Sequence, residues 1–116
     1  MKNFWLDKRV FVTGASGLVG GWLIDSLVKQ GADVVALVRD WVPHSRFLGG
    51  TSLSKCTMVR GDLSDAKFLE RVLAEYEISV IFHLAAQPIV PIANTSPLST
   101  FESNIAGTWN LLEASR

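Results

Sequence analysis

Residues 13–20 read Thr-Gly-Ala-Ser-Gly-Leu-Val-Gly, which places a glycine at every third position from Gly14 to Gly20. A dinucleotide pyrophosphate needs backbone N–H groups aimed at it, without a Cβ in the way, at a helix N-terminus whose partial positive charge favours an anion. We expect Gly14 to make the sharp turn off a strand, Gly17 to let the backbone approach the phosphates, and Gly20 to let the helix pack closely on the sheet. The alternative is a glycine-rich turn that binds no ligand.

The residues on either side of this motif have the pattern of a strand and a helix. Residues 10–13 form a short apolar run rich in β-branched side chains, which predicts a buried strand. After the motif, Gly31 stands where a glycine commonly ends a helix, and apolar residues recur before it at helical spacing, namely Leu18, Trp22, Leu23, Leu27 and Val28. A strand, a glycine turn and a helix within about 30 residues is the setting in which the motif indicates dinucleotide binding.

The rest of the chain continues the alternation of strands and helices. In chain order we predict a strand at 33–38, a strand at 57–60, a helix capped by Ser64 and reaching Tyr76, a strand at 78–84, and a helix at 99–115 with Ile105, Trp109 and Leu112 in its apolar stripe. Such alternation forms a parallel sheet wound on both faces by right-handed crossovers. The prediction is one α/β domain over residues 1–116, a Rossmann-type doubly wound sheet limited to about its first four strands.

Composition excludes several other classes. Hydrophobic residues make up 48% of the chain and charged residues 19%, with 11 basic and 11 acidic side chains, so no net charge attracts nucleic acid or a membrane surface. Cys56 is the only cysteine, which excludes an internal disulfide and zinc-ligand spacing and fits a reducing compartment. Without an apolar run of about 18 residues, and with Asp7 near the start, we expect a cytoplasmic protein without a metal, nucleic-acid or membrane partner.

The residues after the second predicted strand bear on the choice of cofactor. An acid at this position accepts a hydrogen bond from the adenosine ribose, whereas an arginine pairs with a 2′-phosphate. The chain has Arg39 followed by Asp40. Arg39 is nearer the strand end, so we favour NADP, with NAD as the alternative if Asp40 takes the place; both side chains can also be solvated loop charges.

Further candidate contacts follow the third and fourth strands. Asp62, followed by Leu63, either accepts from the adenine amino group or completes a turn at a helix start. We interpret His83 as a structural residue rather than a base, while the small side chains beyond it leave space for a flat ligand. Taken together, the candidate cofactor-binding residues are Thr13, Gly14, Ser16, Gly17, Leu18, Val19, Gly20, Arg39, Asp40, Asp62, Leu63, Leu84, Ala85, Ala86 and Gln87.

These motifs resemble the extended short-chain dehydrogenase/reductase family, and within it the sugar-nucleotide 4,6-dehydratases of the CDP-glucose or GDP-mannose type. The resemblance rests on the glycine motif at 13–20, Gly-Asp-Leu at 61–63, His-Leu-Ala-Ala-Gln at 83–87, and the segment 97–114. It implies NAD or NADP as cofactor, a nucleotide-sugar substrate, and a homo-oligomer in the full-length enzyme. It covers the whole chain, but family members are twice this length or more, with a separate substrate domain.

The family's catalytic Tyr-x-x-x-Lys lies beyond the segment that this chain matches. Tyr76 is the only tyrosine and is followed four residues later by Val80, so it does not begin that motif, and we assign no catalytic residue. We expect the dinucleotide-binding part of a sugar-nucleotide 4,6-dehydratase, inactive by itself. The alternatives are a non-catalytic dinucleotide-binding or sensor module, or a sugar-nucleotide epimerase or small-carbonyl reductase of the same family. The apolar strand around 79–82, left without its next neighbour, favours part of an enzyme over a small module.

Overall fold

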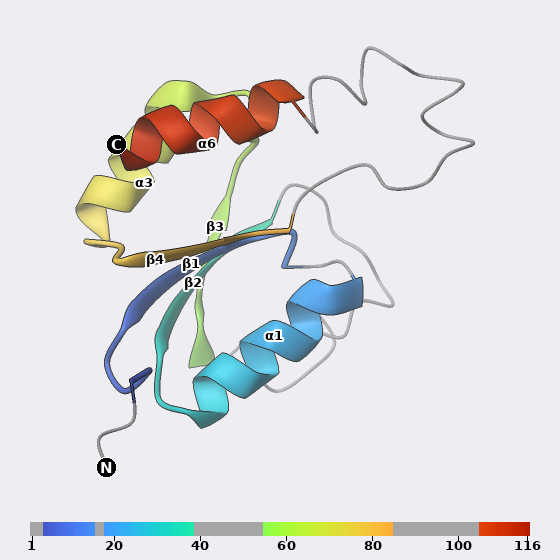
Figure 1. Ribbon diagram of the computed structural model, residues 1–116, viewed down its shortest axis with the longest axis vertical. Coiled ribbons are helices and arrows are strands. Elements are labelled where there is room, and N and C mark those ends of the chain that lie inside the picture. The colour runs from blue at the N-terminus through green and yellow to red at the C-terminus, as the bar shows by residue number, and fades with distance from the viewer. Residues whose placement is uncertain (1–3, 16–17, 39–54, 85–104) are drawn as a thin grey trace.

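A four-stranded parallel sheet with helices on both faces makes up the computed structural model, which describes residues 4–15, 18–38, 55–84 and 105–116, the side chain of Leu18 excepted (Figure 1). In chain order the elements are β1 (Arg9–Thr13), α1 (Leu18–Lys29), β2 (Asp33–Val38), β3 (Thr57–Arg60), α3 (Ala66–Glu75), β4 (Val80–His83) and α6 (Gly107–Ser115). The strand order is β3-β2-β1-β4, and all three pairings are parallel. The predicted Rossmann-type fold is confirmed.

The sheet separates two hydrophobic cores. Helix α1 covers one face, and α3 and α6 cover the other (Figure 1). Because successive side chains of a strand point to opposite faces, β1 and β2 supply both cores. The α1 side buries Val10, Val12, Ala15, Ile24, Leu27, Ala32, Val34, Ala36 and Val38. The α3/α6 side buries Phe11, Val35, Leu37, Leu63, Leu69, Val72 and Leu111. The nearly continuous apolar run of β2 therefore reflects a strand covered on both faces, as predicted.

Strand β4 is less enclosed than the two central strands. All four of its residues are half-buried, and β1 is its only strand neighbour within the part of the chain that the structure describes. The N-terminal segment covers some of it, because the ring of Trp5 lies 5.8 Å from that of Phe82, centroid to centroid. The other long side of β4 keeps its backbone groups unpaired by any described strand, in line with the expectation for this strand.

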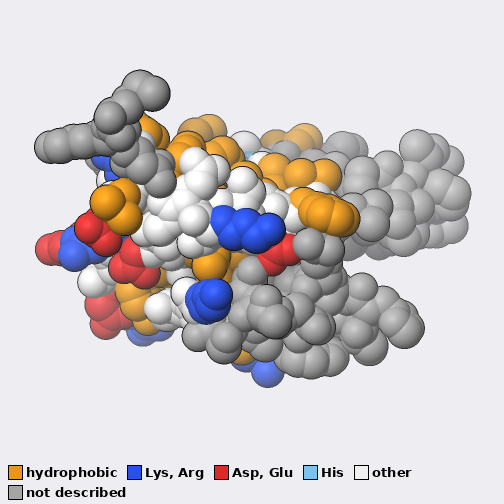
Figure 2. Space-filling model, turned by 90° about the horizontal axis from the view of Figure 1, so that it is seen from below, with side chains coloured by type: hydrophobic (Ala, Val, Ile, Leu, Met, Phe, Trp, Pro, Cys, Tyr) orange, Lys and Arg blue, Asp and Glu red, His pale blue; other side chains and the backbone are white. Residues whose placement is uncertain are grey.

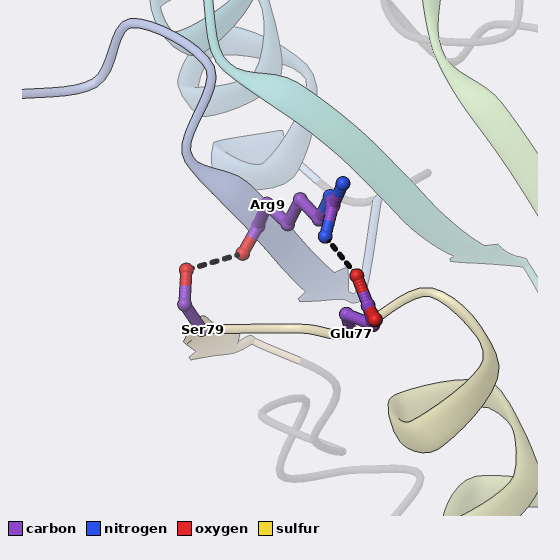
Figure 3. Close-up of polar contacts among 3 residues, drawn as sticks. All are labelled: Arg9, Glu77 and Ser79. Atoms are coloured by element: carbon purple, nitrogen blue, oxygen red, sulfur yellow. Dashed lines mark hydrogen bonds and ion pairs between the residues drawn. The ribbon is translucent and has the colours of Figure 1, made fainter.

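Two predicted boundaries differ from the structure. The N-cap of α3 is Asp65, whose side chain accepts from the backbone N–H of Phe68 at 3.1 Å, and not Ser64. The backbone N–H of Ser64 instead donates to Asp62 Oδ1, which holds Ser64 in the preceding turn. Strand β4 spans Val80–His83, shorter than the predicted 78–84. Just before it, the backbone N–H of Ser79 donates to the carbonyl of Arg9, and so does its hydroxyl (Figure 3).

Two predicted apolar stripes also need correction. Trp22 is 63% exposed, because at 100° per residue it lies on the opposite side of α1 from the buried Ile24. Trp109 and Leu112 on α6, and Ile105 just before it, were expected to face the core but are exposed. The opposite face of α6 is buried at Gly107 and Leu111. Helix α6 is therefore apolar on two faces. The predicted residues 99–104 of this helix lie outside the described residues.

The surface carries charges of both signs. Lys and Arg side chains lie near Asp and Glu side chains on the face shown in Figure 2, with apolar side chains between them. This agrees with the formal net charge of zero. No described helix is long and apolar enough to span a membrane.

Helices α1 and α3 end in the same hydrogen-bonded motif with different residues at its left-handed position. After α1, Gly31 (φ +85°) donates to the carbonyl of Val28, and Ala32 donates to that of Leu27. After α3, Glu77 (φ +50°) and Ile78 make the equivalent bonds to Ala74 and Leu73. The carboxylate of Glu77 also pairs with the guanidinium of Arg9, which ties this turn to β1 (Figure 3).

These two turns give a matched test of the left-handed backbone. Glu77→Gly and Glu77→Ala both remove the ion pair with Arg9, so their difference isolates the backbone effect. We expect Glu77→Gly to be more stable than Glu77→Ala by about 1 kcal/mol, because a Cβ is unfavourable in this conformation. Gly31→Ala should lower the free energy of unfolding because of the left-handed backbone at this position, since the nearby Leu6 Cδ1 belongs to an exposed side chain that can move away. Urea denaturation measures all three, and a Glu77→Ala variant at least as stable as Glu77→Gly would contradict the expectation.

Candidate functional site

The carboxyl end of β1 leads directly into the glycine turn. Thr13 is fully buried, and the next residue, Gly14, has φ +72°. A Cβ on Gly20 would lie 2.2 Å from the carbonyl oxygen of Gly14 and 2.9 Å from Cα of Ala15. The predicted turn at Gly14 is present, and Gly20 permits a close approach, although to the turn itself rather than to the sheet. The first turn of α1 is thus packed against the backbone that leaves β1.

Hydrogen bonds join this turn to the adjacent strand. Thr13 and His83 are register partners on β1 and β4, and Thr13 Oγ1 lies 2.7 Å from His83 Nδ1. The backbone N–H of Leu84 donates to Thr13 Oγ1 at 3.0 Å and to the carbonyl of Thr13 at 3.2 Å. The end of β1 is therefore held from β4 through both its side chain and its backbone.

The second ring nitrogen of His83 contacts α6. His83 Nε2 lies 2.9 Å from Thr108 Oγ1, so both nitrogens of the ring have a hydroxyl partner. This supports the interpretation of His83 as a structural residue. The sequence offered no signal for its pairing with Thr108, because the two are 25 residues apart and follow no spacing rule.

The surroundings of His83 favour its neutral form. A neutral imidazole has one donor and one acceptor, and a threonine hydroxyl can act as either, so the neutral ring is satisfied in both tautomers. Burial lowers the pKa of His83 below its ordinary value. The ring is thus neutral at pH 7, which fits a fixed hydrogen-bonding role at the end of β4.

The end of β3 shows Asp62 in a turn. Asp62 Oδ1 accepts from the backbone N–H of Ser64 at 3.2 Å, and its carbonyl accepts from the backbone N–H of Asp65 at 3.1 Å. Of the two roles considered for this carboxylate, the structure contains the turn-completing one. The side chain of Leu63 is buried in the α3/α6 core, and its carbonyl accepts from Asn110 Nδ2 at 2.8 Å, which helps to hold α6.

The other candidate residues are only partly described. Val19 and Leu84 are exposed, at the start of α1 and just beyond β4. Outside the described residues are the side chain of Leu18 and the whole of Ser16, Gly17, Arg39, Asp40, Ala85, Ala86 and Gln87. The structure therefore brings together the Thr13–Gly14 turn, the start of α1 and the end of β4.

Neither a reactive thiol nor a metal cluster is found at this edge in the described ranges. Burial, with smaller effects from the carboxylates of Asp25 and Asp33, raises the pKa of Cys56 to about 11, so this side chain stays a thiol. Within residues 4–15, 18–38, 55–84 and 105–116, no group of three or more His, Cys, Asp or Glu side chains could hold a metal ion. The described residues show a left-handed glycine turn after β1 and the start of α1 packed closely against it.

Comparisons with known proteins agree with this architecture. Residues 10–116 match the NAD dependent epimerase/dehydratase family. CDP-glucose 4,6-dehydratase from Salmonella typhimurium is 37% identical over 113 residues, which cover 97% of this chain and 32% of that protein. A GDP-mannose 4,6-dehydratase from Sordaria araneosa is 35% identical over 109 residues, covering 94% of this chain and 20% of that protein.

A solved structure shows the same fold. The UDP-glucose-4-epimerase from Stenotrophomonas maltophila, with bound NAD and formylated UDP-arabinopyranose, superposes with a TM-score of 0.79 at 29% identity. The match covers 92% of this chain and 33% of that one. The chain thus spans about a third or less of the length of these relatives.

The lowered pKa of His83 predicts a pH dependence of stability. In the unfolded chain the ring has a pKa of about 6.5. As the pH falls below this value, the unfolded state takes up a proton that the folded state resists, so the free energy of unfolding decreases until the folded-state pKa is passed. We expect urea denaturation at pH 7.5, 6.5 and 5.5 to show this decrease in the wild type and a smaller one in His83→Asn. His44 is present in both and cancels; identical pH profiles would refute the assignment.

Proposed function

The chain belongs to the NAD dependent epimerase/dehydratase family, and from this premise we propose that it is the dinucleotide-binding part of a sugar-nucleotide 4,6-dehydratase of the CDP-glucose or GDP-mannose type. The predicted resemblance to these dehydratases is confirmed by relatives that are 37% and 35% identical. The single observation that carries the proposal is the glycine turn after β1. The backbone of Gly14 is in the left-handed conformation, and a Cβ on Gly20 would clash with the carbonyl oxygen of Gly14.

The proposed pyrophosphate site is the start of α1. A left-handed turn followed by a helix N-terminus presents backbone N–H groups to an anion. We assign the pyrophosphate to residues 14–20, with Thr13 supporting them from β1. Val19 at the start of α1 and Leu84 just beyond β4 have exposed side chains, and we propose that both contact the dinucleotide. Asp62 and Leu63 are assigned to the adenine side, where the Asp62 turn shapes the backbone.

We propose a nicotinamide dinucleotide as the cofactor and, more specifically, a preference for NADP over NAD. NAD is supported by the family itself and by the related epimerase structure that contains it. A preference for NADP is our finer proposal and rests on the position of Arg39 directly after β2. In the sequence, Ala85, Ala86 and Gln87 directly follow β4, and we propose that the small side chains of Ala85 and Ala86 leave space for a flat ring.

The chemistry of the whole protein is proposed from its relatives. When bound, the nicotinamide accepts and returns a hydride. The described residues contribute binding and orientation, since Tyr76 caps α3 and is followed by Val80 instead of the lysine of a Tyr-x-x-x-Lys motif. We propose that residues 1–116 form the cofactor domain, and that the nucleotide-sugar site and the acid–base residues belong to the remaining length seen in relatives. An epimerase shares this domain and is the second candidate, supported by the solved epimerase structure.

A non-catalytic binding module is less well supported. The half-buried β4 leaves one long edge without a described partner strand, and an unpaired apolar edge favours pairing with further chain. We further propose that the whole protein is a homo-oligomer. We also propose that it works in the cytoplasm, which agrees with Cys56, the only cysteine of these 116 residues, being a free thiol.

The phosphate site is tested by adding a carboxylate to it. Gly17→Asp should abolish binding of NADH and NADPH, because its charge and bulk would face the pyrophosphate. Ser26→Asp is the matched control, since it adds the same charge at an exposed position of α1. Titration calorimetry measures both, and circular dichroism verifies the fold. Unchanged affinity in Gly17→Asp would remove the assignment.

The cofactor preference is tested at residues 39 and 40. If Arg39 pairs with the 2′-phosphate, Arg39→Ala should lower the affinity for NADPH by about tenfold or more, as expected for the loss of a charge-assisted hydrogen bond. The affinity for NADH should stay within about twofold of the wild-type value. Asp40→Ala should then change neither. The opposite pattern, in which Asp40→Ala weakens NADH and Arg39→Ala has no effect, would assign the ribose to Asp40 and the protein to NAD.

A further inference from the structure

Three elements meet at the imidazole of His83. Its Nδ1 lies 2.7 Å from Thr13 Oγ1 on β1, and its Nε2 lies 2.9 Å from Thr108 Oγ1 on α6. The ring itself belongs to the last residue of β4. A single side chain thus spans from the strand that carries the glycine turn to the helix on the α3/α6 face.

The contact on the β1 side acts on the residue that directly precedes the turn. Thr13 is fully buried, and its hydroxyl is bonded both to the ring of His83 and to the backbone N–H of Leu84. Its carbonyl, which belongs to the peptide group shared with Gly14, also accepts from Leu84. A movement of Thr13 therefore moves the Gly14 peptide with it.

The turn is also closely packed against the first turn of α1. On its far side the Gly14 carbonyl is packed so closely against Gly20 that a single added Cβ would lie 2.2 Å from it. Gly14 is held between β4, acting through Thr13, and the first turn of α1. A change on the β4 side is transmitted to the backbone that is proposed to face the phosphates.

We propose that His83 is a positioning residue of the dinucleotide site: its Nδ1 fixes Thr13 and thereby the Gly14 turn, while Thr108 holds the ring in place from α6. This rests on the proposed function, because it assigns the turn to cofactor binding. A merely structural role for His83 makes a different prediction, namely that any substitution affects cofactor affinity only to the extent that it destabilises the fold.

Two substitutions distinguish the contributions of the two ring nitrogens of His83. The side-chain amide of His83→Asn reaches the position of Nδ1 and can keep the contact with Thr13 while losing that with Thr108. The amide of His83→Gln reaches the position of Nε2 and keeps the contact with Thr108 while losing that with Thr13. Each variant removes one hydrogen bond to a threonine, so their free energies of unfolding should be similar.

The first measurement is NADH affinity by calorimetry on the full 116-residue chain. We expect His83→Gln to lower the affinity for NADH by about tenfold, the upper range for the loss of one neutral hydrogen bond. The NADH affinity of His83→Asn should stay within about threefold of that of the wild type. Val72→Ala is the control for stability alone, because Val72 is a residue of α3 that is buried in the core on the opposite side of the sheet from α1. It should lower stability without changing NADH affinity. Equal affinities for the Asn and Gln variants would overturn the proposal.

A second measurement needs no ligand. The backbone amide resonances of Gly14 and Ala15 should shift in His83→Gln and stay close to the wild type in His83→Asn. If the wild-type chain binds no NADH, the proposed function fails, and these resonances still decide whether His83 positions the turn. If the wild type binds NADH and the resonances shift equally in both variants, the positioning role fails while the proposed function stands.

Discussion

The central place of β1 in the parallel sheet is the constraint on which the rest of this structure depends. β1 pairs with β2 on one side and with β4 on the other, and its side chains enter both hydrophobic cores. Parallel neighbours require crossover connections, and the helices in those connections cover both faces of the sheet. The carboxyl end of β1 consequently lies in the middle of the edge where the neighbouring strands also end. The glycine turn is therefore close to α1 on one side and is held through Thr13 by the end of β4 on the other.

Much of this arrangement could be predicted because it is encoded locally. The runs at Val10–Val12 and Val34–Val38 are apolar on both faces, and that pattern has few solutions other than a central parallel strand. The turn at Gly14 could be predicted for a similar reason, since a glycine after a strand and before a helix indicates a backbone that other residues disfavour. In each case a few consecutive residues determine the result.

The errors arose where two neighbours compete or where distant segments meet. Ser64 and Asp65 are both good caps, and Asp62 decides between them by engaging the backbone of Ser64. Helix α6 is apolar on two faces, so its sequence does not say which face meets the sheet. The contact between Asn110 and the carbonyl of Leu63, 47 residues earlier, contributes to that choice, and so does Thr108 with His83. Such pairings depend on the tertiary fold and follow no local spacing.

The strand order has a consequence for the chain as it is made. Synthesis releases the N-terminal elements first, so β1, α1 and β2 are available to pair while β4 and α6 are still absent. Thr13 can bond to His83 only after 70 more residues have been made, and Nε2 of His83 gains its partner only when Thr108 has been made. The earliest strand to emerge therefore completes its hydrogen bonds only after β4 and Leu84 have been made, long after the glycine turn that directly follows it.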